Sequence, residues 1–80
     1  MNSKQIMYAI HSEKYGYMKN PKYDERDYLS SDWDFNRGNA YLSSEKQSMR
    51  AMMMDLDRKH ARDCIVKEVI VDKFVHFCSF

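Results

Sequence analysis

The spacing of apolar positions changes along the chain, and each spacing predicts a different element. Residues 5–11 place Ile, Tyr and Ile on one face of an extended chain, which is typical of a β-strand. Polar residues 12–14 predict a tight turn, and residues 15–18 a short return strand. This hairpin is expected to end at Asn20-Pro21, because proline cannot donate a ladder hydrogen bond. Gly16 predicts a bulge or a close approach of another backbone.

Residues 45–61 have the spacing of a helix with one buried face. Apolar side chains recur every three or four residues; they are Met49, Met52, Met53 and Leu56, with His60 next on the same stripe. Ser44 followed by Gln47 has the pattern of a capping box, which predicts the helix start. Met54 lies off the stripe, and methionine also serves on adaptable binding surfaces. Met49, Met52 and Met53 lie on the stripe and are expected in the core.

The remaining segments complete the order of elements. Residues 64–77 are rich in β-branched side chains and predict a long last strand with a bend or bulge at residues 72–73. Residues 40–42 predict a short strand that leads into the helix. Residues 22–39 follow neither period throughout, so we expect a long ordered loop there, with a short helical turn near residues 24–28.

This order, β-β-β-α-β, predicts an α+β fold with two layers, in which a small antiparallel sheet packs on one main helix. Eighty residues form a single domain, 1–80. A chain of this length buries roughly 60% of its unfolded surface, so its core is small.

Charge and composition argue against several classes of protein. Thirteen basic and twelve acidic residues give a net charge of +1, whereas a nucleic-acid binder is usually clearly basic. No apolar run approaches the 18 residues of a membrane-spanning helix, and the N-terminus lacks the features of a signal peptide. We therefore expect a cytoplasmic protein with reduced Cys64 and Cys78 and no cofactor.

Four residues near the end of the chain are of types that zinc accepts; they are His60, Cys64, His76 and Cys78. Their spacing matches no familiar pair of zinc ligands. The preferred explanation is a helix-end histidine that favours the helix dipole, two buried or frayed cysteines and a tail histidine. We predict no metal site, and metal analysis of the purified protein would test this.

The segment 22–39 carries the main candidates for recognition. Aromatic residues and arginine often anchor interfaces, and flanking carboxylates steer a protein toward a basic partner. The predicted partner-binding residues are Tyr28, Trp33, Phe35, Arg37, Asp24, Asp27, Asp32 and Asp34. The segment lacks the calcium-loop pattern and a partnered nucleophile. The alternative is a solvated loop held in place by its aromatic side chains.

A second hypothesis is a small RNA-binding module. Hairpin tyrosines would stack on bases while cations contact phosphate; this set is Lys14, Tyr15, Tyr17, Lys19, Arg58, Lys59 and Arg62. The alternative for the helix cations is a solvated face, because basic residues favour the C-terminal end of a helix.

The layout resembles a broad class of small bacteriophage proteins. The similarity rests on the opening strand at residues 6–10, the return at residues 15–18, the tryptophan-containing loop, the Ala-Tyr-Leu segment before the S-x-x-Q helix and the valine-rich last strand. It covers residues 39–71 most closely. The resemblance implies host-takeover or counter-defence work of the anti-CRISPR type. Such a protein would be a non-enzymatic inhibitor that occludes a host defence or regulatory protein or ribonucleoprotein in the bacterial cytoplasm. A homodimer through an edge strand is left open.

Overall fold

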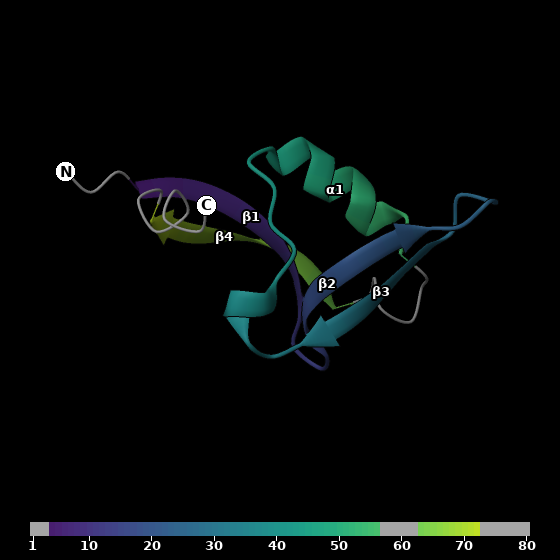
Figure 1. The fold of residues 1–80 in the computed structure, drawn as a ribbon, viewed down its shortest axis with the longest axis horizontal. Helices are drawn as coiled ribbons and strands as arrows, with labels where there is room; N and C mark the ends of the chain where they lie inside the picture. The colour runs from purple at the N-terminus through teal and green to yellow at the C-terminus, as the bar shows by residue number, and fades with distance from the viewer. Residues whose placement is uncertain (1–3, 57–62, 73–80) are drawn as a thin grey trace, which may run out of the picture.

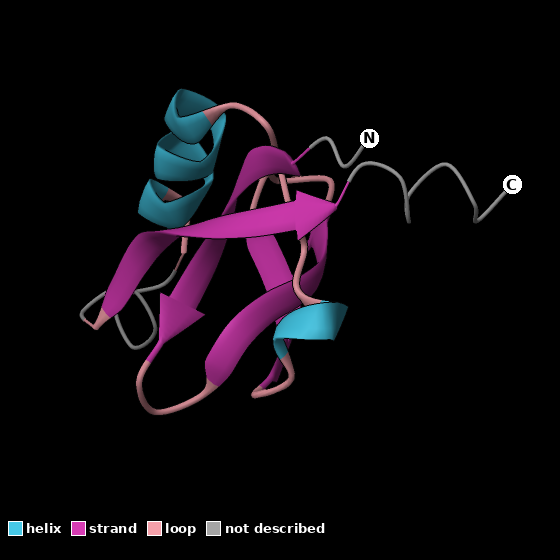
Figure 2. Ribbon diagram, turned by 90° about the vertical axis from the view of Figure 1, so that its left-hand side faces the viewer, coloured by secondary structure: helices cyan, strands magenta, loops and turns pink. Residues whose placement is uncertain are grey.

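The computed structural model describes residues 4–56 and 63–72, which form a four-stranded antiparallel sheet and one α-helix (Figure 1). In chain order the elements are β1 (Lys4–Ser12), β2 (Gly16–Tyr23), β3 (Leu29–Asp34), the 3₁₀ turn η1 (Arg37–Asn39), α1 (Lys46–Met54) and β4 (Cys64–Asp72). The strands lie in the order β3-β2-β1-β4. Helix α1 packs against β1 and β4 on one side of the sheet (Figure 2). The predicted two-layer α+β fold is confirmed.

The predicted loop at residues 22–39 is wrong, because β3 occupies its centre and pairs with an extended β2. Strand β2 does not stop at Pro21. Its register with β3 shifts between Lys19 and Lys22, and Asn20 takes a left-handed conformation with φ of 50°. This irregularity accommodates the proline, which strands tolerate at bulges. The third strand of the β-β-β-α-β order is therefore residues 29–34, not residues 40–42.

Residues 40–43 instead fill the space between β1 and β2. These two strands pair only next to their turn, at His11–Tyr17 and Ser12–Gly16. Beyond that point the Tyr41 N–H donates to the Met18 carbonyl at 2.9 Å. The N–H of Tyr8 donates to the Ser43 carbonyl at 2.8 Å, and a return bond of 3.0 Å forms an isolated bridge. This segment thus joins the two halves of the sheet.

Helix α1 is shorter than predicted and begins differently. Glu45 is its N-cap residue and has no side-chain capping bond, so the predicted Ser44–Gln47 capping box is wrong. The Ser43 hydroxyl accepts the Glu45 N–H at 3.1 Å instead. The helix ends at Met54, where the next two N–H groups donate to the carbonyls three residues before them. Residues 57–62, including His60, lie outside the described residues.

The core lies between α1 and the sheet and contains the predicted methionine stripe. Its buried residues are Ile10, Met18, Met49, Leu56 and Cys64, and Met52 and Met53 pack against them from partly buried positions. Each large apolar side chain buried here stabilises the fold by about 1.5–3 kcal/mol. Met54 is 83% exposed, as its position off the stripe predicts.

Two residues fix the β1–β2 turn. The buried Ser12 hydroxyl accepts the N–H groups of Lys14 and Tyr15, at 3.1 and 3.2 Å, and donates to Asp63 at 3.0 Å. Gly16 has φ of 92°, and a Cβ there would lie 2.6 Å from the Asp34 carbonyl oxygen. The predicted close backbone approach is confirmed.

Strand β4 pairs with β1 over nine consecutive residue pairs. Its predicted continuation to residue 77, with His76 and Cys78 nearby, lies outside the described residues. Within the described part of the chain, no helix has the length and apolar character needed to cross a membrane.

Candidate interaction surface

The turn that joins β2 to β3 projects beyond the end of α1 (Figure 1). We call residues 23–28 the hairpin tip. One Asp24 carboxylate oxygen accepts the N–H groups of Arg26 and Tyr28, at 2.8 and 2.9 Å. The Asp24 N–H donates to the Tyr28 carbonyl, and the Asp27 N–H donates to the Asp24 carbonyl, both at 3.0 Å. Four hydrogen bonds therefore fix the backbone of this short turn.

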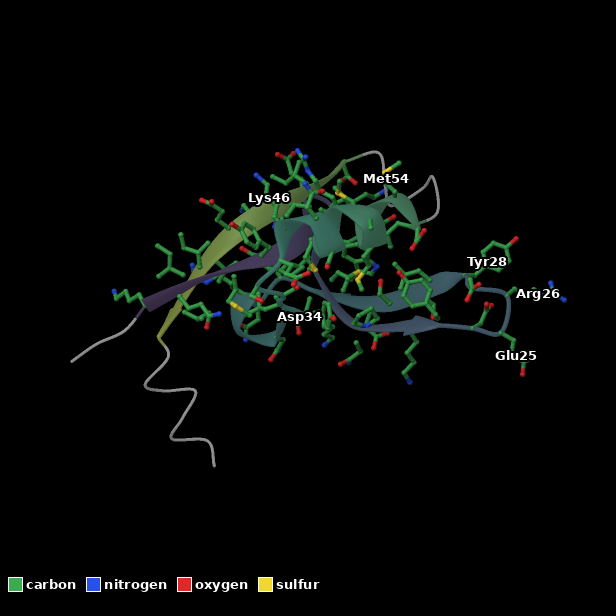
Figure 3. All side chains as sticks on the ribbon, turned by 90° about the horizontal axis from the view of Figure 1, so that it is seen from above. Glu25, Arg26, Tyr28, Asp34, Lys46 and Met54 are labelled. Atoms are coloured by element: carbon green, nitrogen blue, oxygen red, sulfur yellow. The ribbon has the colours of Figure 1, made fainter. Side chains whose placement is uncertain are left out.

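Side chains of the hairpin tip point outward from this fixed backbone. Figure 3 shows Glu25, Arg26 and Tyr28 at the far end of the hairpin. The Tyr28 side chain is 67% exposed and that of Tyr23 is 46% exposed. With Asp24 they line a shallow depression. Tyrosine and arginine are the residue types that most often dominate binding energy at protein interfaces.

The hairpin tip is tied to the end of the helix. The Tyr23 hydroxyl donates a 2.9 Å hydrogen bond to the carboxylate of Asp55, the C-cap residue of α1. Burial and this bond raise the pKa of Tyr23 above its ordinary value. Asp55 follows Met54, the most exposed of the large hydrophobic residues of the described chain. The bond thus places the hairpin tip beside the end of α1, and these two segments carry three exposed hydrophobic residues: Tyr23, Tyr28 and Met54.

The predicted partner-binding residues do not form one patch. Tyr28, Asp24 and Asp27 belong to the hairpin tip, whereas Phe35 and Arg37 lie past the opposite end of β3. Phe35 is 69% exposed, but the length of β3 separates it from Tyr28 by roughly 20 Å. These residues therefore cannot all contact one small site.

The central residues of β3 face two sides of the sheet. Trp33 is half-buried and packs against the core, so part of its surface stabilises the fold. Asp32 and Asp34 alternate with it along the strand and face the other side. Asp32 is exposed and accepts a 3.4 Å bond from the Asn20 amide.

Asp34 is held by three neighbours. Its carboxylate accepts the Asn36 N–H at 2.8 Å, the Asn39 amide at 2.9 Å and the Lys19 ammonium at 3.0 Å. These bonds, led by that of Asn36, lower the pKa of Asp34 to about 2. The charge of Asp34 thus fastens the end of β3 to β2 and η1.

The residues proposed to bind RNA also lie on different surfaces of the protein. Tyr17 lies on the sheet side away from α1, where its ring meets His11 edge-on with centroids 4.5 Å apart. The Lys67 ammonium lies 5.7 Å from the Tyr17 centroid. Burial, with Lys67 second, lowers the pKa of His11.

Tyr15 instead lies 6.1 Å from Trp33, measured between ring centroids, and the Lys14 ammonium is 5.5 Å from the Tyr15 ring. Because Trp33 packs on the core beneath α1, Tyr15 and Tyr17 do not share a stacking surface. The candidates Arg58, Lys59 and Arg62 lie outside the described residues.

The described part of the chain brings together no three His, Cys, Asp or Glu side chains that could hold a metal ion. Cys64 is buried, and burial together with Asp63 raises the pKa of its thiol to about 11. A thiol with this pKa stays protonated near neutral pH and is a poor nucleophile or metal ligand.

Sequence reasoning missed Tyr23, Glu25 and Arg26 as members of the surface. The available signal was Asp24, since Asp often caps a turn by accepting the N–H groups that follow it. An Asp two residues before an exposed arginine, between two segments able to form strands, indicates a hairpin turn that displays its middle residues. Comparison of the chain with known protein families, with curated proteins and with solved structures found no match.

Proposed function

We propose that this is a non-enzymatic binding protein that attaches to another protein through the hairpin tip. The observation that carries the proposal is the projecting turn, where Asp24 fixes the backbone while Arg26 and Tyr28 point outward. A rigid turn loses little conformational freedom on binding, so more of the contact energy appears as affinity. Tyr23 adds a second exposed ring at the tip, and its bond to Asp55 brings the tip close to the helix end that carries the exposed Met54.

The charges around the tip favour a basic partner. Three carboxylates, Asp24, Glu25 and Asp27, surround the single cation Arg26. Rim charges of this kind act mainly on the rate of association and on partner choice. The anchor energy is therefore assigned to Tyr28 and Arg26, and the selectivity to their acidic neighbours.

The resemblance to small bacteriophage proteins extends this proposal to a biological role. In that role the protein is a phage-type inhibitor, and the hairpin tip blocks the working surface of a host defence or regulatory protein or ribonucleoprotein. Occlusion of this kind needs no catalytic group on the protein.

The proposal is tested by capture from a bacterial lysate with the immobilised full-length protein, with and without nuclease. A partner that survives nuclease and is lost with Arg26→Ala and Tyr28→Ala supports it. Lys46→Ala, at the far end of the helix (Figure 3), is the matched charge control for Arg26→Ala. Equal capture by all these variants would contradict the proposal.

One observation favours RNA binding as a second candidate. Tyr17, His11 and Lys67 place two rings and a cation together on the side of the sheet away from the helix, and stacking with nearby positive charge is how single strands are bound. A salt titration with a labelled single-stranded RNA tests it, because phosphate contacts weaken steeply as salt rises. No binding would exclude this candidate. Binding that does not depend on salt, or that Tyr17→Ala leaves unchanged, would also exclude it.

A further inference from the structure

The outer edge of β4 has no strand beside it among residues 4–56 and 63–72. β4 is nine residues long, contains neither Gly nor Pro and keeps one continuous register with β1. Ile65 and Ile70 are 55% and 63% exposed. A long, regular, apolar edge of this kind readily pairs with another chain.

The opposite edge of the same sheet is protected. β3 has six residues, carries Asp32 and Asp34 and pairs with β2 through a shifted register. Short length, charge and irregularity are the devices by which proteins prevent edge pairing. Because the β3 edge has these devices and the β4 edge has few of them, the β4 edge is the more open of the two to pairing.

The backbone hydrogen bonds of β1 show which N–H and C=O groups of β4 point to its outer edge and can pair with another strand. Tyr8 exchanges both backbone bonds with Ser43, so its N–H and C=O point away from β4. Tyr8 lies directly opposite Glu68, which makes this a non-hydrogen-bonded pair of the antiparallel ladder. The N–H and C=O of Glu68 therefore point to the outer edge. By alternation, so do those of Val66 and Ile70.

The charge pattern disfavours a second copy as the occupant. Two β4 strands related by a twofold axis perpendicular to the sheet would run antiparallel. The register that pairs all nine residues places Glu68 opposite Glu68, and a neighbouring register places Lys67 opposite Lys67. Like charges directly opposite each other destabilise a sheet. The register centred on Val69 avoids this repulsion but sets Glu68 against Ile70.

We propose that the β4 edge receives an extended apolar segment of another protein that carries lysine or arginine opposite Glu68. Glu68 is exposed and, within the described residues, no cation is paired with it. A basic residue on the incoming strand supplies that cation. The segment adds a fifth strand, a recognised mode of peptide binding, and covers parts of Ile65 and Ile70. This inference does not depend on the hairpin tip.

The test uses the isotope-labelled full-length protein and two blocked nine-residue peptides of alternating valine and threonine, identical except for a central lysine or glutamate. The lysine peptide is expected to slow amide exchange at Val66, Glu68 and Ile70 at least tenfold. It is expected to bind about fivefold more tightly than the glutamate peptide. Glu68→Lys is expected to reverse this preference, whereas Asp32→Lys on the opposite edge leaves it unchanged.

Equal binding of the two peptides, or no slowing at those three amides, would overturn the inference. Slow exchange at the same amides in the protein alone would also overturn it. In that case the edge is already filled, by a second copy if the protection grows with protein concentration and by the chain itself if it does not.

Discussion

The hydroxyl of Tyr23 donates a 2.9 Å hydrogen bond to the carboxylate of Asp55, 32 residues further along the chain. This bond links the hairpin tip to the end of α1. Because the phenol must be protonated to donate, and its pKa is raised in the folded protein, the contribution of the bond to stability is complete below pH 10. It is lost as the pH rises through the folded-state pKa.

Tyr23→Phe is expected to lower the free energy of unfolding by about 0.5–1 kcal/mol at neutral pH, since it removes one exposed hydrogen bond. The difference from the wild type should shrink above pH 10. Chemical denaturation at pH 7 and pH 11 measures both effects. Tyr41→Phe is the control: Tyr41 is similarly exposed, and its backbone N–H, which the substitution keeps, makes its bond to β2. An equal loss in the two variants would contradict the role of Asp55.

Ser12→Ala is expected to cost about 1–3 kcal/mol, because it leaves the N–H groups of Lys14 and Tyr15 without their acceptor at a partly buried turn. It also removes the link to Asp63. Thermal or urea unfolding checks the loss. Ser30→Ala, at an exposed serine of β3, is expected to change stability by less than about 0.5 kcal/mol. Similar effects of the two changes would show that the Ser12 network is unimportant.

Gly16→Ala is expected to destabilise the protein by about 2 kcal/mol or more, because φ is 92° and the new Cβ would meet the backbone at Asp34 and Phe35. Gly38→Ala is the control, since its Cβ would meet only the Asn36 side chain, at 3.2 Å. Urea unfolding curves of both variants measure the two losses of stability. A fully stable Gly16→Ala protein would contradict the described contact of β2 with the end of β3.

Asp34 predicts a specific loss of stability in acid. Its pKa falls from 3.8 to about 2 on folding, so its contribution is complete above pH 4 and is lost as the pH falls through 2. The carboxyl titration followed by NMR reports this pKa directly. Asp34→Asn should flatten the stability profile between pH 4 and pH 2. A carboxyl pKa near 3.8 would mean that the bonds from Asn36, Asn39 and Lys19 do not hold in solution.

Much of the fold follows from local periodicity. The alternation of residues 5–11 and the β-branched run after Cys64 predict β1 and β4, and the stripe headed by Met49 predicts α1. Strand β3 was not predicted, because Asp32 and Asp34 make its outward face polar and Pro21 predicts the end of the preceding strand. Tertiary pairing overrides both signals. The prediction of the helix cap was wrong for a related reason. The backbone bridge to Tyr8 fixes the position of Ser43, and the Ser43 hydroxyl then accepts the Glu45 N–H.

Sequence proximity was a poor guide to the candidate surface. Tyr28 and Phe35 are seven residues apart and equally exposed, yet an extended strand places them at opposite ends of β3. Tyr23 is near Tyr28 because a turn reverses the chain between them. Its bond with Asp55 depends on how the hairpin passes the helix, which no local pattern contains.

The matched pair Tyr28→Ala and Phe35→Ala tests the central claim most directly, because the two aromatic residues are 67% and 69% exposed and lie at opposite ends of one strand. The measurement is the affinity of each full-length variant for the captured protein partner, by titration calorimetry. We predict that Tyr28→Ala weakens binding by about 2 kcal/mol or more while Phe35→Ala changes it by less than about 0.5 kcal/mol. Equal effects, or a larger effect at Phe35, would contradict binding through the hairpin tip.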